Sequence, residues 1–482
     1  MHRWSMALLL LMLFLTTLLS AACGGGTARK ERDMFVRVSP RDPRYFELDD
    51  GRPFIPIGLN IATSWGGRLD TTLGWIRKLG AHGGNFCRLW ISQPLLDVEH
   101  ARSGAYDAQK AERIEALLAA AREHGVRVKM CIEHFRAIDP ERSRQRWALK
   151  AIHHVSEGGP YRGCGEFFDS ERGRAQFKAK LAWFRERFGD EPTIFGWELW
   201  NEMNCVRGGD WIAWTEAMLA ELHRLFPRNL AMQSLGSFDR QGARGYYRRV
   251  VTLKTNDVAQ IHRYLDLGAR LEVCHGPVDV LAADAIGELR SYEPGKPMLL
   301  AESGAVEPRH TGPFKLYPRD TAGIILHDVV FAPFFAGAAG TGHCWHWGNY
   351  VDKLDLWHHF ARFAAAAEGL DPPAEGFEPV TIPHERLRVY ALKGRRTFLA
   401  WCRDSQNTWM TELKESKAPE TLRDATLVLG DHAAAYADTE ARCYDPWSDK
   451  WTQAELSDGG IALPAFSRSL VVRIGPPPPR AR

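Results

Sequence analysis

The sequence predicts an α/β fold: a (β/α)8 TIM barrel followed by a small C-terminal β-sandwich domain. From Pro53 to Leu370, short apolar segments rich in β-forming residues alternate with longer amphipathic segments, which is typical of repeated βα units. Eight such apolar segments can be counted, the number that closes a barrel. After Pro373 the helical periodicity stops, and short strand-like segments separated by turns replace it.

The predicted barrel domain covers residues 34–370. The segment 34–50 is expected to supply short strands that close the barrel floor. Apolar residues spaced by three and four positions predict amphipathic helices between the strands, for example over 111–125 and 174–189. The barrel strands are expected within residues 53–61, 84–92, 126–135, 193–202, 229–235, 257–265, 297–303 and 341–347.

The longest connection runs from Phe135 to Glu171 and is rich in His and Gly. Long connections in compact domains are usually functional or disordered. Because this one would follow the third strand, we expect it to rise over the C-terminal face of the barrel, where the active sites of this fold lie. It would then form one wall of a cleft.

The segment 371–475 is predicted to be a β-sandwich accessory domain, and residues 476–482 a disordered, Pro-rich tail. Strands are expected within 388–394, 397–403, 425–430 and 469–475. No catalytic residue is assigned to this domain. Its tryptophans either form a sugar-binding strip or fill the core, and core packing is the favoured interpretation; they are Trp401, Trp409, Trp447 and Trp451.

The N-terminus reads as a signal peptide over residues 1–22. His2 and Arg3 precede an apolar run from Ala7 to Leu19 that ends in small residues, and this run is shorter than the ~20 residues of a membrane-spanning helix. Cys23 would then open the mature chain, ahead of a flexible tether over 23–33. The segment resembles a bacterial lipoprotein signal, which implies lipidation of Cys23 and an exported, lipid-anchored cell-envelope protein. Simple secretion is the alternative.

Composition narrows the possible partners. The 62 Lys and Arg residues nearly balance the 59 Asp and Glu residues, so the formal net charge is only +3. Such a balance argues against a nucleic-acid ligand. The 17 tryptophans favour a carbohydrate ligand, because aromatic faces bind the apolar faces of sugar rings. No oligomeric state is predicted. Disulfides are possible among loop cysteines 164, 205 and 274, or between Cys402 and Cys443.

Two acidic residues each end a predicted barrel strand, Glu202 the fourth and Glu302 the seventh. Catalytic residues of barrel enzymes come from these strand ends. Hydrolysis of a glycosidic bond needs one protonated carboxyl group, to assist the leaving oxygen, and one ionised carboxylate. The pair supplies both, although either residue alone could form an ordinary salt bridge.

At these positions the chain resembles the clan A glycoside hydrolases, especially the cellulase-like family five. Asn201-Glu202 matches the acid/base signature of that family. Glu302 is similar to its nucleophile, although many members have an aromatic residue where this chain has Ser303. The likeness continues in the expected order over the whole predicted barrel, through Arg88, His134, His262-Arg263-Tyr264 and the tryptophan-rich end of the eighth strand.

The resemblance implies a general acid/base role for Glu202 and a nucleophile role for Glu302. Direct attack by a nucleophile requires the two carboxyl groups to lie about 5–5.5 Å apart, with retention of configuration. The resemblance also implies that Arg88 and Tyr264 point at Glu302 and keep it ionised, because donated hydrogen bonds and nearby positive charge lower a carboxylate pKa.

The remaining implied contacts are with substrate. Asn201 should hydrogen-bond the sugar 2-hydroxyl, and His134 and His262 should bind other hydroxyls. Trp347, or as second choice Trp345, should form the floor under the sugar next to the scissile bond. Each residue also has a structural interpretation, because an arginine can pair with a barrel acid and a histidine or tryptophan can pack in the core.

Neither a metal nor an organic cofactor is expected. His343 and His346 near the eighth strand raise a metal alternative, but the H-E-x-x-H pattern and the strand-one H-x-H pattern of zinc hydrolases do not occur. Glu133 and Glu198 also lie in predicted strands. We interpret Glu198 as a structural acid, partly buried and paired with a group such as an arginine.

The sequence therefore predicts a retaining glycoside hydrolase that cleaves β-linked oligo- or polysaccharides of the β-mannan or β-glucan class. Two alternatives use the same residues or the same fold. A transglycosylase would pass the glycosyl group to a sugar instead of water, and a non-catalytic surface lipoprotein would bind carbohydrate in the barrel cleft.

Overall fold

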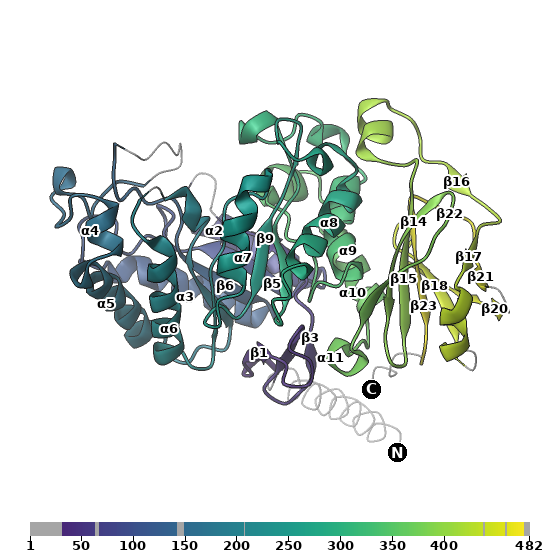
Figure 1. The fold of residues 1–482 in the computed structure, drawn as a ribbon, viewed down its shortest axis with the longest axis horizontal. Coiled ribbons are helices and arrows are strands. Elements are labelled where there is room, and N and C mark those ends of the chain that lie inside the picture. The colour runs from purple at the N-terminus through teal and green to yellow at the C-terminus, as the bar shows by residue number, and fades with distance from the viewer. Residues whose placement is uncertain are drawn as a thin grey trace, which may run out of the picture.

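The computed structural model describes residues 31–62, 67–141, 149–206, 208–436, 439–457 and 460–476. The predicted signal peptide, Cys23, the tether before residue 31 and the tail after residue 476 lie outside the described residues. Figure 1 shows two regions side by side: an α/β region coloured purple to green, and a C-terminal region of antiparallel sheet coloured green to yellow.

Parallel strands form the centre of the α/β region. Each strand lies inside a segment predicted to be a strand. One ladder joins β4 (Gly58–Asn60), β5 (Phe86–Trp90), β6 (Arg127–Glu133), β7 (Ile194–Trp200) and β8 (Leu230–Met232). A second, two-stranded ladder joins β9 (Ala259–His262) to β11 (Met298–Glu302). These strands are buried throughout, as expected for a parallel sheet covered by helices.

The expected closed ring of eight strands is not observed as one continuous ladder. Within the described residues no ladder joins β8 to β9, although Asp257 N donates to Ala231 O at 2.9 Å across that gap. The eighth predicted segment contributes single parallel bridges from Cys344 to Leu59 and to Ser303. The ring is interrupted because its contacts here are single hydrogen bonds along short segments.

Helices alternate with the strands and cover them. They are α2 (Leu69–Ala81), α3 (Ala108–Glu123), α4 (Cys164–Phe168), α5 (Glu171–Phe188), α6 (Trp211–Leu225), α7 (Arg244–Val251), α8 (Val278–Arg290), α9 (Ile324–Phe335) and α10 (His358–Ala367). The predicted helices at 111–125 and 174–189 correspond to α3 and α5. α3 begins at Ala108, three residues before the predicted helix, because the side chain of its N-cap residue Asp107 accepts hydrogen bonds from the amides of Gln109 and Lys110.

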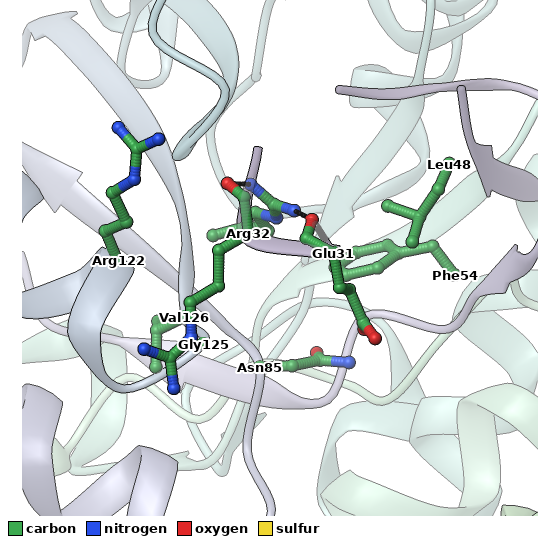
Figure 2. A pocket seen from close by; sticks show the side chains of 9 residues that line it. Glu31, Arg32, Leu48, Phe54, Asn85, Arg122, Gly125 and Val126 are labelled. Atoms are coloured by element: carbon green, nitrogen blue, oxygen red, sulfur yellow. Dashed lines mark hydrogen bonds between the residues drawn. The ribbon is translucent and has the colours of Figure 1, made fainter. Parts of the chain in front are cut away.

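A small antiparallel sheet lies at the amino-terminal ends of the parallel strands. It consists of β1 (Val36–Val38), β2 (Phe46–Leu48) and β3 (Pro53–Phe54). The Phe46 ring packs edge-on against Phe195 of β7, with centroids 5.1 Å apart. Figure 2 shows a pocket at this end, lined by Glu31, Arg32, Leu48, Phe54, Asn85, Arg122, Gly125, Val126 and Arg127. It lies at the opposite ends of the strands from Glu202 and Glu302.

The C-terminal region is built on a six-stranded antiparallel sheet. Its order is β13 (Glu378–Thr381), β14 (Leu387–Lys393), β15 (Phe398–Asp404), β23 (Ser469–Ile474), β18 (Ala441–Asp445) and β19 (Lys450–Ala454). Two smaller sheets accompany it, β17 (Thr426–Val428) with β21 (Gly460–Ala462) and β20 (Leu456–Ser457), and β16 (Thr421–Leu422) with β22 (Phe466–Ser467). Side chains of all three sheets share one buried apolar cluster, as Phe398, Leu427 and Phe466 illustrate.

The tryptophans of this region mostly pack against the α/β region. Trp401 is fully buried against Phe331 and Phe335 of α9, and Trp409 donates its indole N–H to Gly276 O at 2.9 Å. Trp447 lies 4.4 Å from His327 of α9 between ring centroids. For these three residues, the contacts agree with the core-packing interpretation.

The cysteines include Cys402 and Cys443, which are free thiols, so the possible bridge between them is not formed. Cys274 is also a free thiol. Along the described ranges, the search for a helix both long and apolar enough to cross a membrane found none.

Candidate active site

Glu202 lies two residues beyond the end of β7, where the chain turns sharply. Its backbone is left-handed (φ 51°, ψ 53°), a conformation that costs a non-glycine residue energy and recurs at active sites. The Glu202 amide donates to Ser234 Oγ at 3.1 Å, which holds the turn against the end of β8. The carboxylate faces His262, whose Nδ1 lies 3.1 Å from Glu202 Oε1.

Glu302 ends β11 and is almost completely buried, with 3% of its surface exposed. The Tyr264 hydroxyl donates to Glu302 Oε2 at 2.7 Å, and Arg88 Nη1 donates to Oε1. His262 Nδ1 lies 3.3 Å from Oε2. Arg88 and Tyr264 therefore point at Glu302, as predicted.

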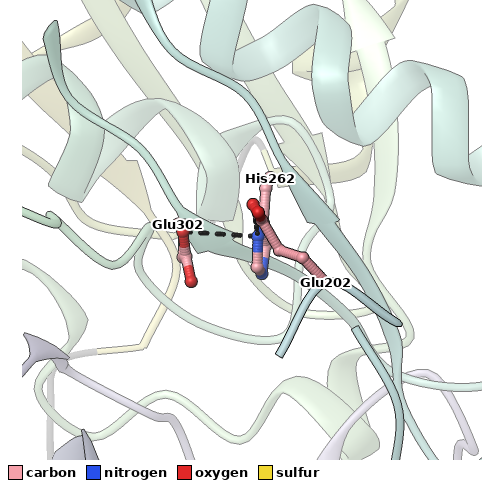
Figure 3. A group of neighbouring side chains, drawn as sticks. All are labelled: Glu202, His262 and Glu302. Carbon is pink, nitrogen blue, oxygen red and sulfur yellow. Dashed lines mark hydrogen bonds and ion pairs between the residues drawn. The ribbon is translucent and has the colours of Figure 1, made fainter. Parts of the chain in front are cut away.

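The two carboxylates face each other across His262 (Figure 3). One oxygen of each carboxylate and one ring nitrogen of His262 lie within 4.8 Å of one another. This oxygen separation is shorter than the ~6.5–9.5 Å between carboxyl groups that admits a water molecule in an inverting enzyme. The arrangement suits direct attack by one carboxylate and proton transfer by the other.

The surroundings of the two carboxyl groups differ. Burial and the negative charge of Glu302 raise the pKa of Glu202 well above its ordinary value. Burial also raises the pKa of Glu302, but the Arg88 cation and the Tyr264 hydroxyl oppose that rise. Glu202 is therefore the group that holds a proton more strongly, and Glu302 is the group better kept as an anion.

Arg88 connects the carboxylate pair to buried residues among the parallel strands. The buried guanidinium of Arg88 binds Glu198 through two nitrogens, at 2.8 and 2.7 Å. It also donates to Asn201 Oδ1 at 2.7 Å and Asn60 Oδ1 at 3.3 Å. Glu198 is thus the paired, buried structural acid that the sequence indicated, and Asn201 is held beside Arg88.

Three further residues of this network were not anticipated: Asn60, Lys129 and Ser234. Lys129 Nζ lies 3.1 Å from Glu198 Oε2, and Ser234 Oγ donates to Glu198 Oε1 at 2.5 Å. These contacts and Arg88 hold the pKa of Glu198 below its ordinary value despite complete burial. The sequence signal for Lys129 is a single lysine inside an otherwise apolar strand, VRVKMCIE, which requires a buried acidic partner.

His134 lies at the end of β6, in an aromatic group at the rim of the site. Its ring stacks on Trp90 at 4.7 Å between centroids, and its Nδ1 lies 2.7 Å from Ser92 Oγ. Burial lowers the pKa of His134 to about 3, so the ring is neutral and can exchange hydrogen bonds with hydroxyls. Trp345 also packs against Trp90, with 4.9 Å between ring centroids.

Trp347, the first choice for the sugar platform, is buried. It is 1% exposed and packs edge-on against Trp75, because the chain enters a helical turn at 347–352 that directs this indole into the core. Trp345, the second choice, is partly exposed and borders the aromatic group with Trp90. Of the two candidates, Trp345 is therefore the more exposed indole.

Possible metal-ligating atoms of Glu202, His262 and Glu302 lie close enough together to be considered as a metal site. Among the described residues, this is the group of such atoms that was found. However, the two Glu302 oxygens already accept from Arg88 and Tyr264. The His262 distances of 3.1 and 3.3 Å suit one N–H shared by two carboxylates. Burial lowers the pKa of His262 well below its ordinary value, which favours the neutral ring.

The other histidines that raised a metal alternative are held separately. The His343 ring stacks on Phe86 at 4.5 Å, and His346 Nδ1 lies 3.0 Å from the Tyr317 hydroxyl. Glu133 turns away from the carboxylate pair toward α5, where it binds Lys180 and also Arg136 at 2.9 Å.

Comparison with known proteins adds to this picture. No protein-family model matches the chain. The chain is similar to mannan endo-1,4-beta-mannosidase 3 of Oryza sativa subsp. japonica, at 26% identity over 62% of this chain and 69% of that protein. It is also similar to mannan endo-1,4-beta-mannosidase 2 of the same organism, at 25% identity over 76% of this chain and 85% of that protein.

Solved structures agree with the two-part fold. A glycoside hydrolase superposes with a TM-score of 0.57 at 13% identity, covering 92% of this chain and 97% of that chain. A glycoside hydrolase family 5 protein from Bacteroides vulgatus gives a TM-score of 0.56 at 14% identity, covering 92% and 94%. The relatives are named as mannan endo-1,4-beta-mannosidases, and the two solved structures show that the chain shares its fold with glycoside hydrolases, one of them of family 5.

Proposed function

We propose that this chain is a retaining glycoside hydrolase that cleaves β-linked mannan. The observation that carries the proposal is the facing pair of Glu202 and Glu302, with one oxygen of each within 4.8 Å and with unequal surroundings. Only Glu302 is bound by both a cation and a phenol hydroxyl. This asymmetry is what an enzyme needs when one carboxyl group donates a proton and the other attacks.

The reaction proceeds in two steps. Glu302 attacks the anomeric carbon while the glycosidic C–O bond breaks, and Glu202 gives its proton to the departing oxygen. Glu202 then removes a proton from water, whose oxygen displaces Glu302 from the anomeric carbon. Two displacements at one carbon return it to the β configuration, so the product retains the stereochemistry of the substrate.

The neighbouring side chains receive supporting roles. Asn201 is assigned to the 2-hydroxyl of the attacked sugar, because its side chain is fixed by Arg88 beside the carboxylate pair. His134 and His262 are assigned to other hydroxyls. Trp345 is assigned to the sugar platform in place of Trp347.

The substrate class rests on the relatives. Two curated relatives are named as mannan endo-1,4-beta-mannosidases, which supports a β-mannan over a β-glucan and cleavage inside the chain over cleavage at its end. Aromatic Trp90 and Trp345 and neutral His134 suit an uncharged polysaccharide.

The test is a panel of β-mannan, glucomannan, mixed-linkage β-glucan and cellulose, with proton NMR of the first products. We expect the largest kcat/KM on β-mannan and a β-anomer that appears before mutarotation. An initial α-anomer would contradict the mechanism. Products longer than the substrate would indicate transglycosylation, and binding of β-mannan without cleavage would support the non-catalytic alternative.

We also propose that the two parallel sheets form one (β/α)8 barrel and that the C-terminal sheets form a β-sandwich. Hydrogen bonds from the Cys344 region to both neighbouring strands support the barrel. The apolar cluster shared by the C-terminal sheets supports the sandwich.

Export with a lipid at Cys23 is proposed from the N-terminal pattern alone. Replacement Cys23→Ser should abolish incorporation of radiolabelled palmitate and release the protein from the membrane fraction. Retention of the label after that replacement would contradict the proposal.

A further inference from the structure

The loop that follows the nucleophile strand has a strained backbone. After β12 (Ala305–Val306), both Arg309 (φ 62°) and His310 (φ 56°) adopt the left-handed conformation. Two adjacent non-glycine residues of this kind cost energy and persist only when surrounding contacts hold them. The base of the loop is closed by the Glu307 amide, which donates to Gly312 O at 2.9 Å.

Asp266 supplies the contact that holds this loop. It is 1% exposed and follows Tyr264 by two residues, in β10 (Leu265–Asp266). Its Oδ1 accepts from the Arg309 amide at 2.9 Å and from the Gly268 amide at 2.7 Å. Its buried Oδ2 makes no hydrogen bond with the described residues and lies 3.6 Å from His310 Nε2.

The same loop places the His310 ring on Tyr264, the residue that donates to Glu302. The two rings meet edge to face, with centroids 5.0 Å apart and planes at 83°. The His310 side chain nevertheless keeps 36% of its surface exposed. Across the described part of the chain, His310 Nδ1 has no hydrogen-bond partner, so this nitrogen remains available to a ligand.

The position of His310 around the barrel identifies which part of the substrate it can reach. Trp90 and His134 end β5 and β6, whereas Tyr264 and His310 follow β9 and β11 on the opposite side of the strand order. Trp345, assigned to the platform under the attacked sugar, packs against Trp90 of β5, with 4.9 Å between ring centroids. The attacked sugar therefore lies on the β5 side, and the departing sugar lies on the side of His310.

We propose that His310 is a specificity-determining residue that hydrogen-bonds a hydroxyl of the departing sugar, with Asp266 and the strained loop holding its ring in place. The proposal deepens the proposed function and rests on it. The ligand is a neutral hexose unit of the β-linked chain. The competing explanation is that His310 only covers Tyr264 and thereby supports Glu302.

The variant His310→Asn distinguishes these explanations, because asparagine tolerates the left-handed backbone but is too short to replace the imidazole. Its kcat/KM is measured on mannohexaose, which fills both sides of the site, and on dinitrophenyl β-mannotrioside, whose sugars lie only on the attacked side. We expect a loss of about fivefold to tenfold on mannohexaose, the size of one lost hydrogen bond, and less than a twofold change on the aryl glycoside.

His223→Asn is the matched control. His223 is 37% exposed and lies 3.5 Å from Asp257, nearly the same exposure and acid distance as His310, but at the other end of the barrel strands. It should change neither rate. Asp266→Ala, which removes the acceptor of the Arg309 and Gly268 amides, should reproduce the selective loss through the loop. Circular dichroism melting reports whether each variant is folded.

Equal losses of His310→Asn on both substrates would overturn the proposal and assign His310 to the support of Tyr264. No loss on either substrate would overturn it as well. These outcomes leave the proposed function intact, since the wild type still cleaves mannohexaose. A folded wild type that cleaves neither substrate would instead overturn the proposed function, and this proposal with it.

Discussion

Two clusters of buried charge differ in what surrounds them. The barrel cluster consists of Arg88, Lys129, Glu198 and Glu302, and the interface cluster joins α8 and α9 to β14 and β15 through Asp279, Asp328, Arg388 and Arg403. Figure 1 shows these helices beside the C-terminal sheet. Each cluster contains two cations and two acids, so total charge does not distinguish them.

The two clusters differ in how many side chains bind one of their acids, as Glu198 and Asp328 show. Glu198 is bound by Arg88, Lys129 and Ser234, and its pKa is lowered although it is fully buried. Asp328 is bound by Arg403 at 2.8 Å, and there burial prevails and raises the pKa to about 7. Burial alone therefore does not determine whether an acidic side chain is protonated or ionised. The barrel cluster keeps the buried Glu198 ionised, and Glu198 holds Arg88 beside Glu302, whereas the interface cluster joins the α/β region to the C-terminal sheet.

The largest expected effect tests whether the barrel cluster serves catalysis. Glu302→Ala should lower kcat/KM on β-mannan by roughly four orders of magnitude or more, since no group remains to form the covalent intermediate. Added azide should restore turnover of a dinitrophenyl glycoside and give the α-glycosyl azide, because azide would occupy the vacated face. Product NMR identifies the anomer.

The matched variant is Glu202→Ala. A dinitrophenolate leaving group needs little protonation, so formation of the covalent glycosyl-enzyme intermediate should survive. Hydrolysis of that intermediate by water should slow, because no general base remains. Azide needs no general base and should then give the β-glycosyl azide. The opposite pair of anomers would reverse the two roles.

Sequence motifs identified much of this site because barrel strand ends bring residues such as Arg88, Tyr264 and Glu302 together wherever the strand order is right. They did not indicate that Trp347 is buried and Trp345 partly exposed, because a local helical turn at 347–352 decides which indole is exposed. They also missed Lys129, whose acidic partner lies on a neighbouring strand far along the chain. The fold was predictable to the level of strands in order, but closure of the ring depends on single hydrogen bonds that no periodicity records.

The interface cluster should affect stability and not chemistry. Arg403→Met removes the cation that faces Asp328 and leaves a buried acid without its partner, at a cost of about 3–5 kcal/mol in the free energy of unfolding. Urea unfolding measures this loss, and kcat/KM at 25 °C should stay within twofold. The double variant Arg403→Met/Asp328→Leu should recover most of the stability. A large loss of activity in the folded single variant would remove the distinction between the clusters.

Lys129→Met should have an intermediate effect, on the pH profile. Burial lowers the pKa of Lys129 to about 8, so the wild type loses this positive charge as the pH rises through that value. Without the charge, Arg88 is drawn more to Glu198 and less to Glu302, and the pKa of Glu302 rises. We expect kcat/KM to fall about tenfold at pH 7 and the acid limb to move to higher pH. Arg388→Met, in the interface cluster, should leave the profile unchanged.

The smallest expected effect compares Asp328 and Glu198 through the pH dependence of stability. The pKa of Asp328 is raised in the folded protein from 3.8 to about 7, so its contribution is fully present below pH 3.8 and is lost as the pH rises through about 7. The pKa of Glu198 is lowered from 4.5, so its contribution is present above that value and is lost only as the pH falls below it. Between pH 5 and 8 the melting temperature of the wild type should therefore fall relative to Asp328→Asn, by roughly 1 °C for each kcal/mol in a chain of this length. Relative to Glu198→Gln it should stay level over the same range. A level difference for Asp328→Asn would mean that Arg403 keeps Asp328 ionised, and the two clusters would then hold their acids in the same way.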